Sequence, residues 1–268
     1  MIFEMNIQDL FSVKNKVVLV TGGATGIGRM AVEALASGGA KVYLASRKLE
    51  ACQAVADELN QTLSGVGHCY ALRADLSNEA GVLELSEAFK KREQHLDILI
   101  NNAGKSWGAS LEEFPWKAWD DVMSVNVSSI FTLTRELLPC LEAGATSENP
   151  ARVINLGSVM GIQATKIIAY SYAASKAAVH HLTRILSNEL ASKNIAVNAI
   201  APGPFASRMM AHITDDKEAA DEMAAGIPLA RLGRPEDVAG LVLYLSSPAS
   251  SYVTGAIIPL DGGIFARG

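Results

Sequence analysis

Short apolar runs alternate with longer amphipathic segments along the chain. The runs, such as VVLVT at 17–21 and KVYLAS at 41–46, are rich in Val, Ile and Leu and alternate little with polar residues. This composition is typical of parallel strands that helices cover on both faces. The pattern predicts strands at 17–21, 41–46, 68–72, 97–101, 151–156, 195–200 and 256–260. It predicts helices at 26–38, 48–63, 78–94, 115–142, 171–192 and 235–246.

This alternation also predicts the fold class. Repeated strand–helix–strand units with right-handed connections wind helices onto both faces of one sheet. We therefore expect an α/β fold, a doubly wound Rossmann-type parallel seven-stranded sheet, in a single domain over residues 1–268. Segment 204–228 opens and closes with proline and interrupts the alternation between the last two strands. Because it follows a strand end, we expect it to form a lid over a substrate.

Composition narrows the possible partners and the compartment. The 268 residues carry a net charge of −5 and contain no Lys/Arg run, which argues against nucleic acid as a partner. The apolar runs are far shorter than the roughly 20 residues that span a bilayer, and the N-terminal residues lack a basic start followed by an apolar block. We expect neither a membrane span nor a secretory signal. The three cysteines, Cys52, Cys69 and Cys140, match neither a disulfide framework nor a zinc site, which favours the reducing cytoplasm.

A glycine-rich turn, TGGATGIG at 21–28, follows the first predicted strand and opens a helix. Glycines let the backbone approach a pyrophosphate, whose charge is stabilised by N–H groups and by the positive end of the helix dipole. This placement favours dinucleotide binding. The alternative is a tight turn whose glycines serve packing only.

Two later strand ends carry further candidate residues for binding a dinucleotide. NAD enzymes usually carry an acidic residue after the second strand, but this chain has Ser46 and Arg47 there. A guanidinium binds a 2′-phosphate bidentately, so we expect NADPH. Alternatively, Arg47 is a solvated cation at a helix start, and Lys48 could share its task. Asp75, after the third strand, is placed either to accept from an adenine amino group or to cap the next helix.

The stretch AYSYAASKAA at 169–178 holds the candidate proton donor. Helical residues four apart share a face and residues six apart do not, so Tyr172 pairs with Lys176 and Tyr170 does not. An ammonium about 4 Å away would lower the pKa of the phenol by about three units from about 10. Ser158 follows the fifth strand, so two hydroxyls and a lysine could surround a carbonyl oxygen that becomes negative as hydride arrives.

These motifs, taken together, resemble the short-chain dehydrogenase/reductase family. The resemblance runs from about residue 12 to 265 and adds to the motifs above NNAG at 101–104, Asn126 in VNV, PG at 202–203, RLGRPEDVA at 231–239 and DGG at 261–263. The stretches NNAGKSWGA, ENPARVINLGSV and APGPFASRM are most similar to 3-oxoacyl-acyl-carrier-protein reductases of the rhamnolipid-associated type.

The resemblance implies a role for each matching residue. Ser158 would orient the carbonyl, Tyr172 would donate the proton, Lys176 would hold the nicotinamide ribose and lower the tyrosine pKa, and Asn126 would anchor a water that replaces the proton. Ala24 and Thr25 stand where NADPH-preferring relatives often carry Ser-Arg, so Arg47 would discriminate largely alone. Family members are usually tetramers, which implies a homotetramer. The implied cofactor-binding residues are Thr21, Gly22, Gly26, Ile27, Gly28, Ser46, Arg47, Asp75, Leu76, Asn102, Ala103, Gly104, Tyr172, Lys176, Pro202, Gly203 and Ser207.

The sequence thus predicts an NADPH-dependent carbonyl reductase acting on a 3-oxoacyl thioester, free or carrier-bound, or on another hydrophobic ketone. NAD-dependent alcohol oxidation at the same site and a non-catalytic nucleotide sensor stay open as alternatives. We expect no metal at His180 and His181, because adjacent helical residues point about 100° apart, and we expect Trp116 and Trp119 to serve packing. The expected apolar pocket is formed by Ser106, Trp107, Val159, Met160, Ile162, Phe205, Met209 and Met210.

Overall fold

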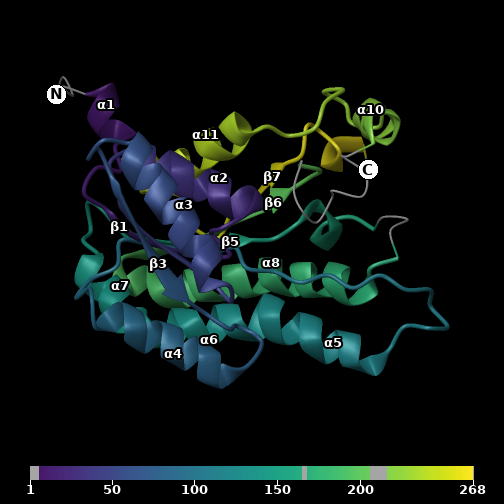
Figure 1. Ribbon diagram of the computed structural model, residues 1–268, viewed down its shortest axis with the longest axis horizontal. Coiled ribbons are helices and arrows are strands. Elements are labelled where there is room, and N and C mark those ends of the chain that lie inside the picture. The colour runs from purple at the N-terminus through teal and green to yellow at the C-terminus, as the bar shows by residue number, and fades with distance from the viewer. Residues whose placement is uncertain (1–5, 165–167, 206–215, 268) are drawn as a thin grey trace.

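A parallel sheet forms the centre of the molecule in the computed structural model, which describes residues 6–164, 168–205 and 216–267 (Figure 1). Within these residues the strand order is β3-β2-β1-β4-β5-β6-β7, and every neighbouring pair is parallel. The predicted seven-stranded Rossmann-type sheet is confirmed. The strands are β1 (Val17–Thr21), β2 (Lys41–Ser46), β3 (His68–Arg73), β4 (Ile98–Asn101), β5 (Ala151–Leu156), β6 (Ile195–Pro202) and β7 (Ile257–Leu260).

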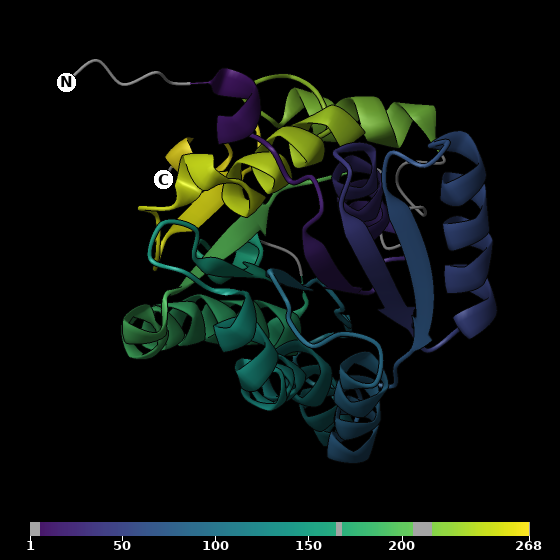
Figure 2. The same cartoon turned by 90° about the vertical axis from the view of Figure 1, so that its left-hand side faces the viewer.

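Helices cover both faces of this sheet, and each helix layer buries its own hydrophobic cluster. On one face lie α2 (Gly26–Ser37), α3 (Leu49–Thr62) and α11 (Pro235–Ser246), packed on strand residues such as Val18 and Leu44. The other face carries α4 (Glu79–Lys90), α6 (Ser129–Glu136), α7 (Leu138–Gly144) and α8 (Tyr170–Leu190). Figure 2 shows the sheet between these two layers. Burial on both faces explains why the strands are almost uniformly apolar.

The region predicted as one helix over 115–142 is instead broken, so that prediction is wrong. It consists of α5 (Trp116–Met123), a π-helical turn η1 (Ser124–Ser128), α6 and α7. Pro139 stands in the first turn of α7, where its missing N–H costs no hydrogen bond. The π turn contains Asn126, and such turns are frequent at functional sites because they redirect a side chain.

Of the helices that the structure describes, two have no counterpart in the sequence-based expectation. They are α1 (Ile7–Leu10) and α10 (Lys217–Ala225), the latter within the expected lid segment 204–228. The Asp216 carboxylate caps α10 by accepting from the backbone N–H of Glu218 at 2.9 Å. Residues 206–215 of that segment lie outside the described residues. The described residues also form short 3₁₀ turns at η2 (Val159–Gly161), η3 (Ala191–Lys193), η5 (Pro248–Ser250) and η6 (Phe265–Arg267).

Among the helices of the described ranges, none combines the length and apolar character that crossing a membrane requires.

Candidate active site

The candidate residues gather at the carboxyl ends of the parallel strands. The chain order along the sheet reverses between β1 and β4, and ligands of such sheets bind in the crevice that this reversal leaves. The glycine-rich turn follows β1, NNAG follows β4, and Ser158 follows β5. The topology therefore brings three separate sequence motifs to one edge.

The glycine-rich turn has the shape of a phosphate cradle. Gly22 and Gly26 have φ of 68° and 55°, a region that favours glycine. A side chain at Gly28 would place its Cβ only 2.3 Å from Asn102 Nδ2. Among the described contacts, the Thr25 side chain makes no cap hydrogen bond to the first N–H groups of α2. These donors and the helix dipole fit the pyrophosphate of a dinucleotide.

Hydrogen bonds clamp this turn to NNAG. The Thr21 hydroxyl accepts from the backbone N–H groups of Asn102 and Ala103, both at 3.0 Å. The Asn102 amide donates to the carbonyl oxygens of Thr21 at 2.8 Å and Gly22 at 3.1 Å. The ends of β1 and β4 are thus fixed relative to each other, which is what a rigid dinucleotide site requires.

Ser46 and Arg47 lie at the end of β2, where a dinucleotide would place its adenosine ribose. The Ser46 hydroxyl donates to the carbonyl of Lys48 and accepts from the Cys52 thiol, both at 3.1 Å. Arg47 is exposed, and no described ion pair includes its guanidinium. The position suits an arginine that meets a phosphate, and it suits a solvated cation equally.

Asp75 does not cap the helix that follows it, so this alternative is wrong. Its carboxylate accepts from the hydroxyl and the backbone N–H of Ser77, at 2.7 and 3.1 Å. Asn78 caps α4 by accepting from Gly81 N at 2.9 Å. The hydrogen bonds from Ser77, assisted by the charge of Arg47, lower the pKa of Asp75, which therefore stays an ionised acceptor.

Ser158, Tyr172 and Lys176 lie together between β5 and the start of α8. Tyr172 is half-buried and hydrogen-bonds to Ser158. The Lys176 ammonium is 5.5 Å from the centre of the Tyr172 ring and donates to the carbonyl of Leu156 at 2.6 Å. Tyr170 lies elsewhere, edge-on to Phe114 with ring centroids 5.3 Å apart. The pairing that helix geometry predicts is the one observed.

The predicted direction of the Tyr172 pKa is wrong. Burial raises the pKa of this phenol, and the hydrogen bond from Ser158 offsets the rise only in part. Burial also lowers the pKa of Lys176 to about 8, because the ammonium loses its water. Loss of solvation therefore favours the neutral phenol and outweighs the hydrogen bond from Ser158.

Asn126 connects NNAG to α8 from within the π turn. It is fully buried, its Oδ1 accepts from Lys105 N at 2.8 Å, and its Nδ2 donates to Lys105 O at 3.0 Å and Ser175 Oγ at 2.9 Å. A Cβ on Gly104 would lie 3.6 Å from Asn126 Oδ1 and 3.7 Å from Lys176 Nζ. Gly104 therefore lies against both side chains, which places NNAG next to the motif that contains Tyr172 and Lys176.

The other expected cofactor residues frame the same edge. Leu76 is buried, and Ile27 packs on the core beneath the turn. Pro202 ends β6, and a Cβ on Gly203 would lie 2.9 Å from Asp261 Cβ. Ser207, Met209 and Met210 lie outside the described residues.

The expected pocket residues do not all line one cavity. Phe205 belongs to the hydrophobic core, where a Cβ on Gly233 would lie 2.2 Å from its ring. Val159 is buried and Trp107 is 42% exposed. Trp116 is 79% exposed, so the expectation that it packs is wrong for this single chain.

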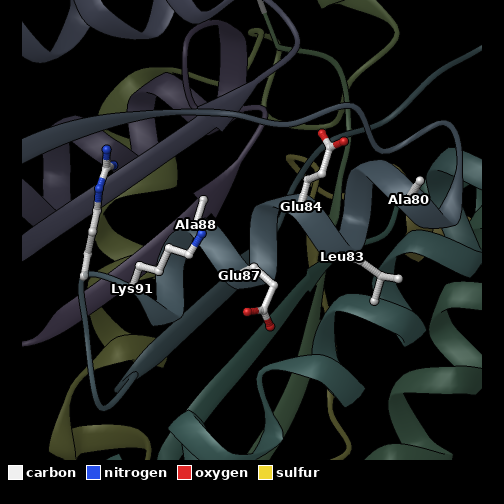
Figure 3. A pocket seen from close by; sticks show the side chains of 7 residues that line it. Ala80, Leu83, Glu84, Glu87, Ala88 and Lys91 are labelled. Carbon is white, nitrogen blue, oxygen red and sulfur yellow. The ribbon is translucent and has the colours of Figure 1, made fainter.

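A shallow hollow on the surface lies apart from the candidate site at the carboxyl ends of the strands. Figure 3 shows it along α4, where both signs of charge line it and no candidate site residue contributes. Its lining residues are Ala80, Leu83, Glu84, Glu87, Ala88, Lys91 and Arg92. Within the parts of the chain that the structure describes, no cluster of three or more His, Cys, Asp or Glu could hold a metal ion.

His180 contacts the segment that carries Ser158, although the sequence drew attention to it only as a rejected metal ligand. Its Nε2 accepts from the backbone N–H of Ser158 at 3.4 Å. The signal in the sequence was its spacing, four residues after Lys176 and eight after Tyr172, which places all three on one helix face.

Comparisons with known proteins identify the family of this chain. A family model described as enoyl-(acyl carrier protein) reductase matches residues 22–265. A rhamnolipids biosynthesis 3-oxoacyl-[acyl-carrier-protein] reductase from Pseudomonas aeruginosa is 49% identical over 253 residues, which cover 94% of this chain and 97% of that protein. A 2-dehydro-3-deoxy-D-gluconate 5-dehydrogenase from Bacillus subtilis is 34% identical, with 97% and 99% covered.

Solved structures give the same result. The Pseudomonas aeruginosa RhlG/NADP active-site complex superposes with a TM-score of 0.91 at 48% identity, over 97% of this chain and 100% of that one. A gluconate 5-dehydrogenase from Burkholderia cenocepacia, in complex with NADP and tartrate, superposes with a TM-score of 0.87 at 27% identity, over 97% and 99% of the two chains. The motifs, the fold and these relatives agree: the chain belongs to the short-chain dehydrogenase/reductase family.

Proposed function

We propose that this protein is an NADPH-dependent carbonyl reductase that transfers hydride to a ketone, with a 3-oxoacyl thioester as its substrate class. One observation carries the proposal: Tyr172 hydrogen-bonds to Ser158 while the buried Lys176 ammonium lies beside the tyrosine ring. The relative that is 49% identical is named as a 3-oxoacyl-[acyl-carrier-protein] reductase, which supports the substrate class.

In this proposal each side chain acts on the carbonyl oxygen or on its surroundings. NADPH, when bound, supplies the hydride that reaches the carbonyl carbon. Ser158 donates to the carbonyl oxygen and orients it, and Tyr172 transfers its phenolic proton to that oxygen, so the ketone becomes an alcohol. Because burial raises the Tyr172 pKa, the phenol keeps its proton at neutral pH and is ready to donate it.

Lys176 and Asn126 have supporting roles. Lys176 would hold the nicotinamide ribose through the donors that its bond to Leu156 leaves over. Asn126 would anchor a water through which the proton on Tyr172 is replaced. Its place between Lys105 and Ser175, next to Gly104, supports that role.

We also propose the cofactor-binding residues named from the family resemblance, with Arg47 on the 2′-phosphate. The exposure of Arg47 and the complex of the similar RhlG protein with NADP support this choice. The cradle from Gly22 to Gly28 would take the pyrophosphate, and Asp75 would accept from the adenine amino group.

We propose that exposed apolar residues near the start of α8 would contact an acyl chain. Trp107, Leu111 and Ile168 are 42%, 70% and 51% exposed, and the backbone N–H of Ala109 donates to the carbonyl of Ile168 just before α8. Segment 204–228 would cover the substrate from the other side as a lid. Delivery of the substrate on an acyl carrier protein is part of the proposal. Assays that compare carrier-bound with free 3-oxoacyl thioesters test it.

We propose a cytoplasmic homotetramer. The free thiols of Cys52, Cys69 and Cys140 fit a reducing compartment. Trp116, Phe131 and Ile185 are exposed apolar residues on α5, α6 and α8, and a partner subunit would cover them. Light scattering coupled to size exclusion tests this assembly: a mass of four chains is expected, and a monomer at micromolar concentration contradicts it.

The test of the function is a substrate panel with a matched pair of tyrosine variants. Acetoacetyl thioesters, longer 3-oxoacyl thioesters and cyclic ketones are assayed with NADPH and NADH. The parent should oxidise NADPH with at least one ketone, Tyr172→Phe should lose about 10²- to 10⁴-fold in rate, and Tyr170→Phe should match the parent. If Tyr172→Phe kept the parent's rate with every ketone that the parent reduces, the assignment would be wrong.

A further inference from the structure

Three residues on one face of α8 contact the segment that carries Ser158. Tyr172, Lys176 and His180 are spaced by four, so they form a stripe along the helix. Tyr172 forms a hydrogen bond with the Ser158 side chain, and Lys176 donates a hydrogen bond to the carbonyl of Leu156. His180 accepts a hydrogen bond from the backbone N–H of Ser158. The serine is therefore held by two members of the stripe, one on its side chain and one on its backbone.

The imidazole of His180 packs directly on this segment. The side chain is buried, and a Cβ on Gly157 would lie 2.0 Å from its Nε2. On the next turn, a Cβ on Gly161 would lie 2.5 Å from the backbone carbon of Lys176. The two glycines thus let the segment approach the helix closely enough for His180 to reach the N–H of Ser158.

Only a neutral imidazole can accept this hydrogen bond at Nε2, so the proton must be on Nδ1. Burial lowers the pKa of His180 to about 4, a backbone hydrogen bond to Gly161 opposes the shift, and the charges of Lys176 and Arg184 reinforce it. His180 is therefore an acceptor throughout the physiological pH range.

We propose that His180 is a positioning residue for carbonyl reduction: by accepting the Ser158 N–H, it fixes the turn that aims the Ser158 hydroxyl at Tyr172. The Ser158 hydroxyl also accepts from Met160 N at 3.2 Å, which fixes it from the other side. This inference rests on the proposed reductase function, and it assigns to the reaction a buried side chain that touches neither substrate nor cofactor.

The first test compares an apolar and an acceptor substitution. His180→Leu removes the acceptor and leaves a buried N–H without a partner, whereas the amide oxygen of His180→Gln can reach the Ser158 N–H. We expect kcat to fall about tenfold to hundredfold in His180→Leu with the KM for NADPH within about twofold, and to recover within about threefold in His180→Gln. Equal losses in both variants, or no loss in His180→Leu, would overturn the proposal.

The neighbouring histidine provides a matched control. His181 is exposed on the same helix, so His181→Leu should leave kcat and KM unchanged. A loss in His181→Leu equal to that in His180→Leu would show a general effect of α8 and would overturn the proposal.

A double-mutant cycle tests whether His180 acts through the serine. In the Ser158→Ala background, the hydroxyl that His180 is proposed to position is gone, so His180→Leu should lower the residual kcat by less than about twofold. Additive losses in the double variant would contradict the proposal.

Hydrogen exchange separates a failure of this inference from a failure of the proposed function. The Ser158 amide should exchange slowly in the parent and in His180→Gln, and at least about tenfold faster in His180→Leu, whether or not a ketone is reduced. Equal exchange rates in all three proteins would overturn the inference. A parent that reduces no ketone would refute the reductase function and leave the exchange result to decide on the contact.

Discussion

Cations at the two ends of the sheet have different partners. At the amino end, Lys16 forms an ion pair of 2.7 Å with Asp97, and Lys41 pairs with the buried Glu93, which also accepts from the Tyr43 hydroxyl. At the carboxyl end, Lys176 is 4% exposed, and no ion pair among the described residues includes it. Its partner is the neutral carbonyl of Leu156.

Arg152 is the buried cation of the amino end, and no ion pair among the described residues includes it. Arg152 donates to Ser247 O at 3.0 Å, and burial lowers its pKa to about 10 while the charge of Asp97 acts in the opposite direction. At the amino end, carboxylates therefore pair with Lys16 and Lys41, and the charge of Asp97 opposes the effect of burial on Arg152 only in part. At the carboxyl end, the buried Lys176 has no carboxylate partner among the described residues. An unpaired buried charge is typical of a group that binds a ligand or takes part in a reaction.

The largest expected effect is at Lys176. Lys176→Met removes the ammonium from the site and, at the same time, a charge whose burial costs stability. We expect kcat/KM for ketone reduction to fall about 10²- to 10³-fold, while the melting temperature stays the same or rises. Steady-state kinetics and thermal unfolding measure the two quantities. A clear loss of stability would place Lys176 among the structural charges of the fold.

The opposite result is expected at Asp97. Asp97→Ala leaves Lys16 and Arg152 without their anion and the N–H of Val17 without its acceptor. We expect the free energy of unfolding to fall by about 3 kcal/mol with kcat unchanged. Denaturant unfolding checks this, with the exposed Asp57→Ala as a control that should cost less than about 0.5 kcal/mol. If Asp97→Ala lowered kcat as much as Lys176→Met does, the two ends of the sheet would not differ in the role of their charges.

A smaller effect concerns the pH dependence of stability. The pKa of His180 falls from 6.5 to about 4 on folding, so the folded state favours the neutral form. This contribution is fully present above pH 6.5 and is lost as the pH falls toward about 4. Between about pH 7.5 and pH 5 the parent should lose about 2 kcal/mol more than His180→Gln. If the free energy of unfolding fell by the same amount in both proteins over this pH range, the result would contradict the lowered pKa of His180.

The smallest effect is expected at Arg47, a cation at the carboxyl edge that is exposed. Arg47→Ala should raise the KM for NADPH about tenfold and leave the KM for NADH unchanged, since only the 2′-phosphate is lost as a partner. Lys48→Ala, run beside it, measures how far the neighbouring lysine shares the task. Equal affinity of the parent for both cofactors would contradict the preference for NADPH.

Hydrophobic pattern was sufficient to predict the sheet, because strands buried on both faces have to be apolar throughout. β1 was predicted with its observed bounds, and the predicted bounds of β6 differ only by the two residues added at its end. Helix periodicity was not sufficient for 115–142, because a π turn changes the backbone without changing which residues are apolar. α10 was missed because its short helix lies between prolines, where loop composition dominates the pattern.

The motifs of the site were predictable where local geometry alone places the residues. Spacing on a helix identified Tyr172 over Tyr170, and the strand end identified Ser158. The pKa of Tyr172 was not predictable, because its direction depends on how many surrounding atoms exclude water. The contact of His180 with Ser158 depends on the close approach that Gly157 allows, a tertiary feature that no pattern in one sequence reports.

The most direct measurement is the titration of Lys176 in the folded protein by NMR, with lysine side chains labelled and Lys176→Met used to assign the signal. The uncompensated burial of this ammonium predicts a pKa of about 8, clearly separated from the exposed lysines. A Lys176 signal that titrates together with the exposed lysines, above about pH 10, would show that its charge is solvated or paired and would contradict the difference between the two ends of the sheet.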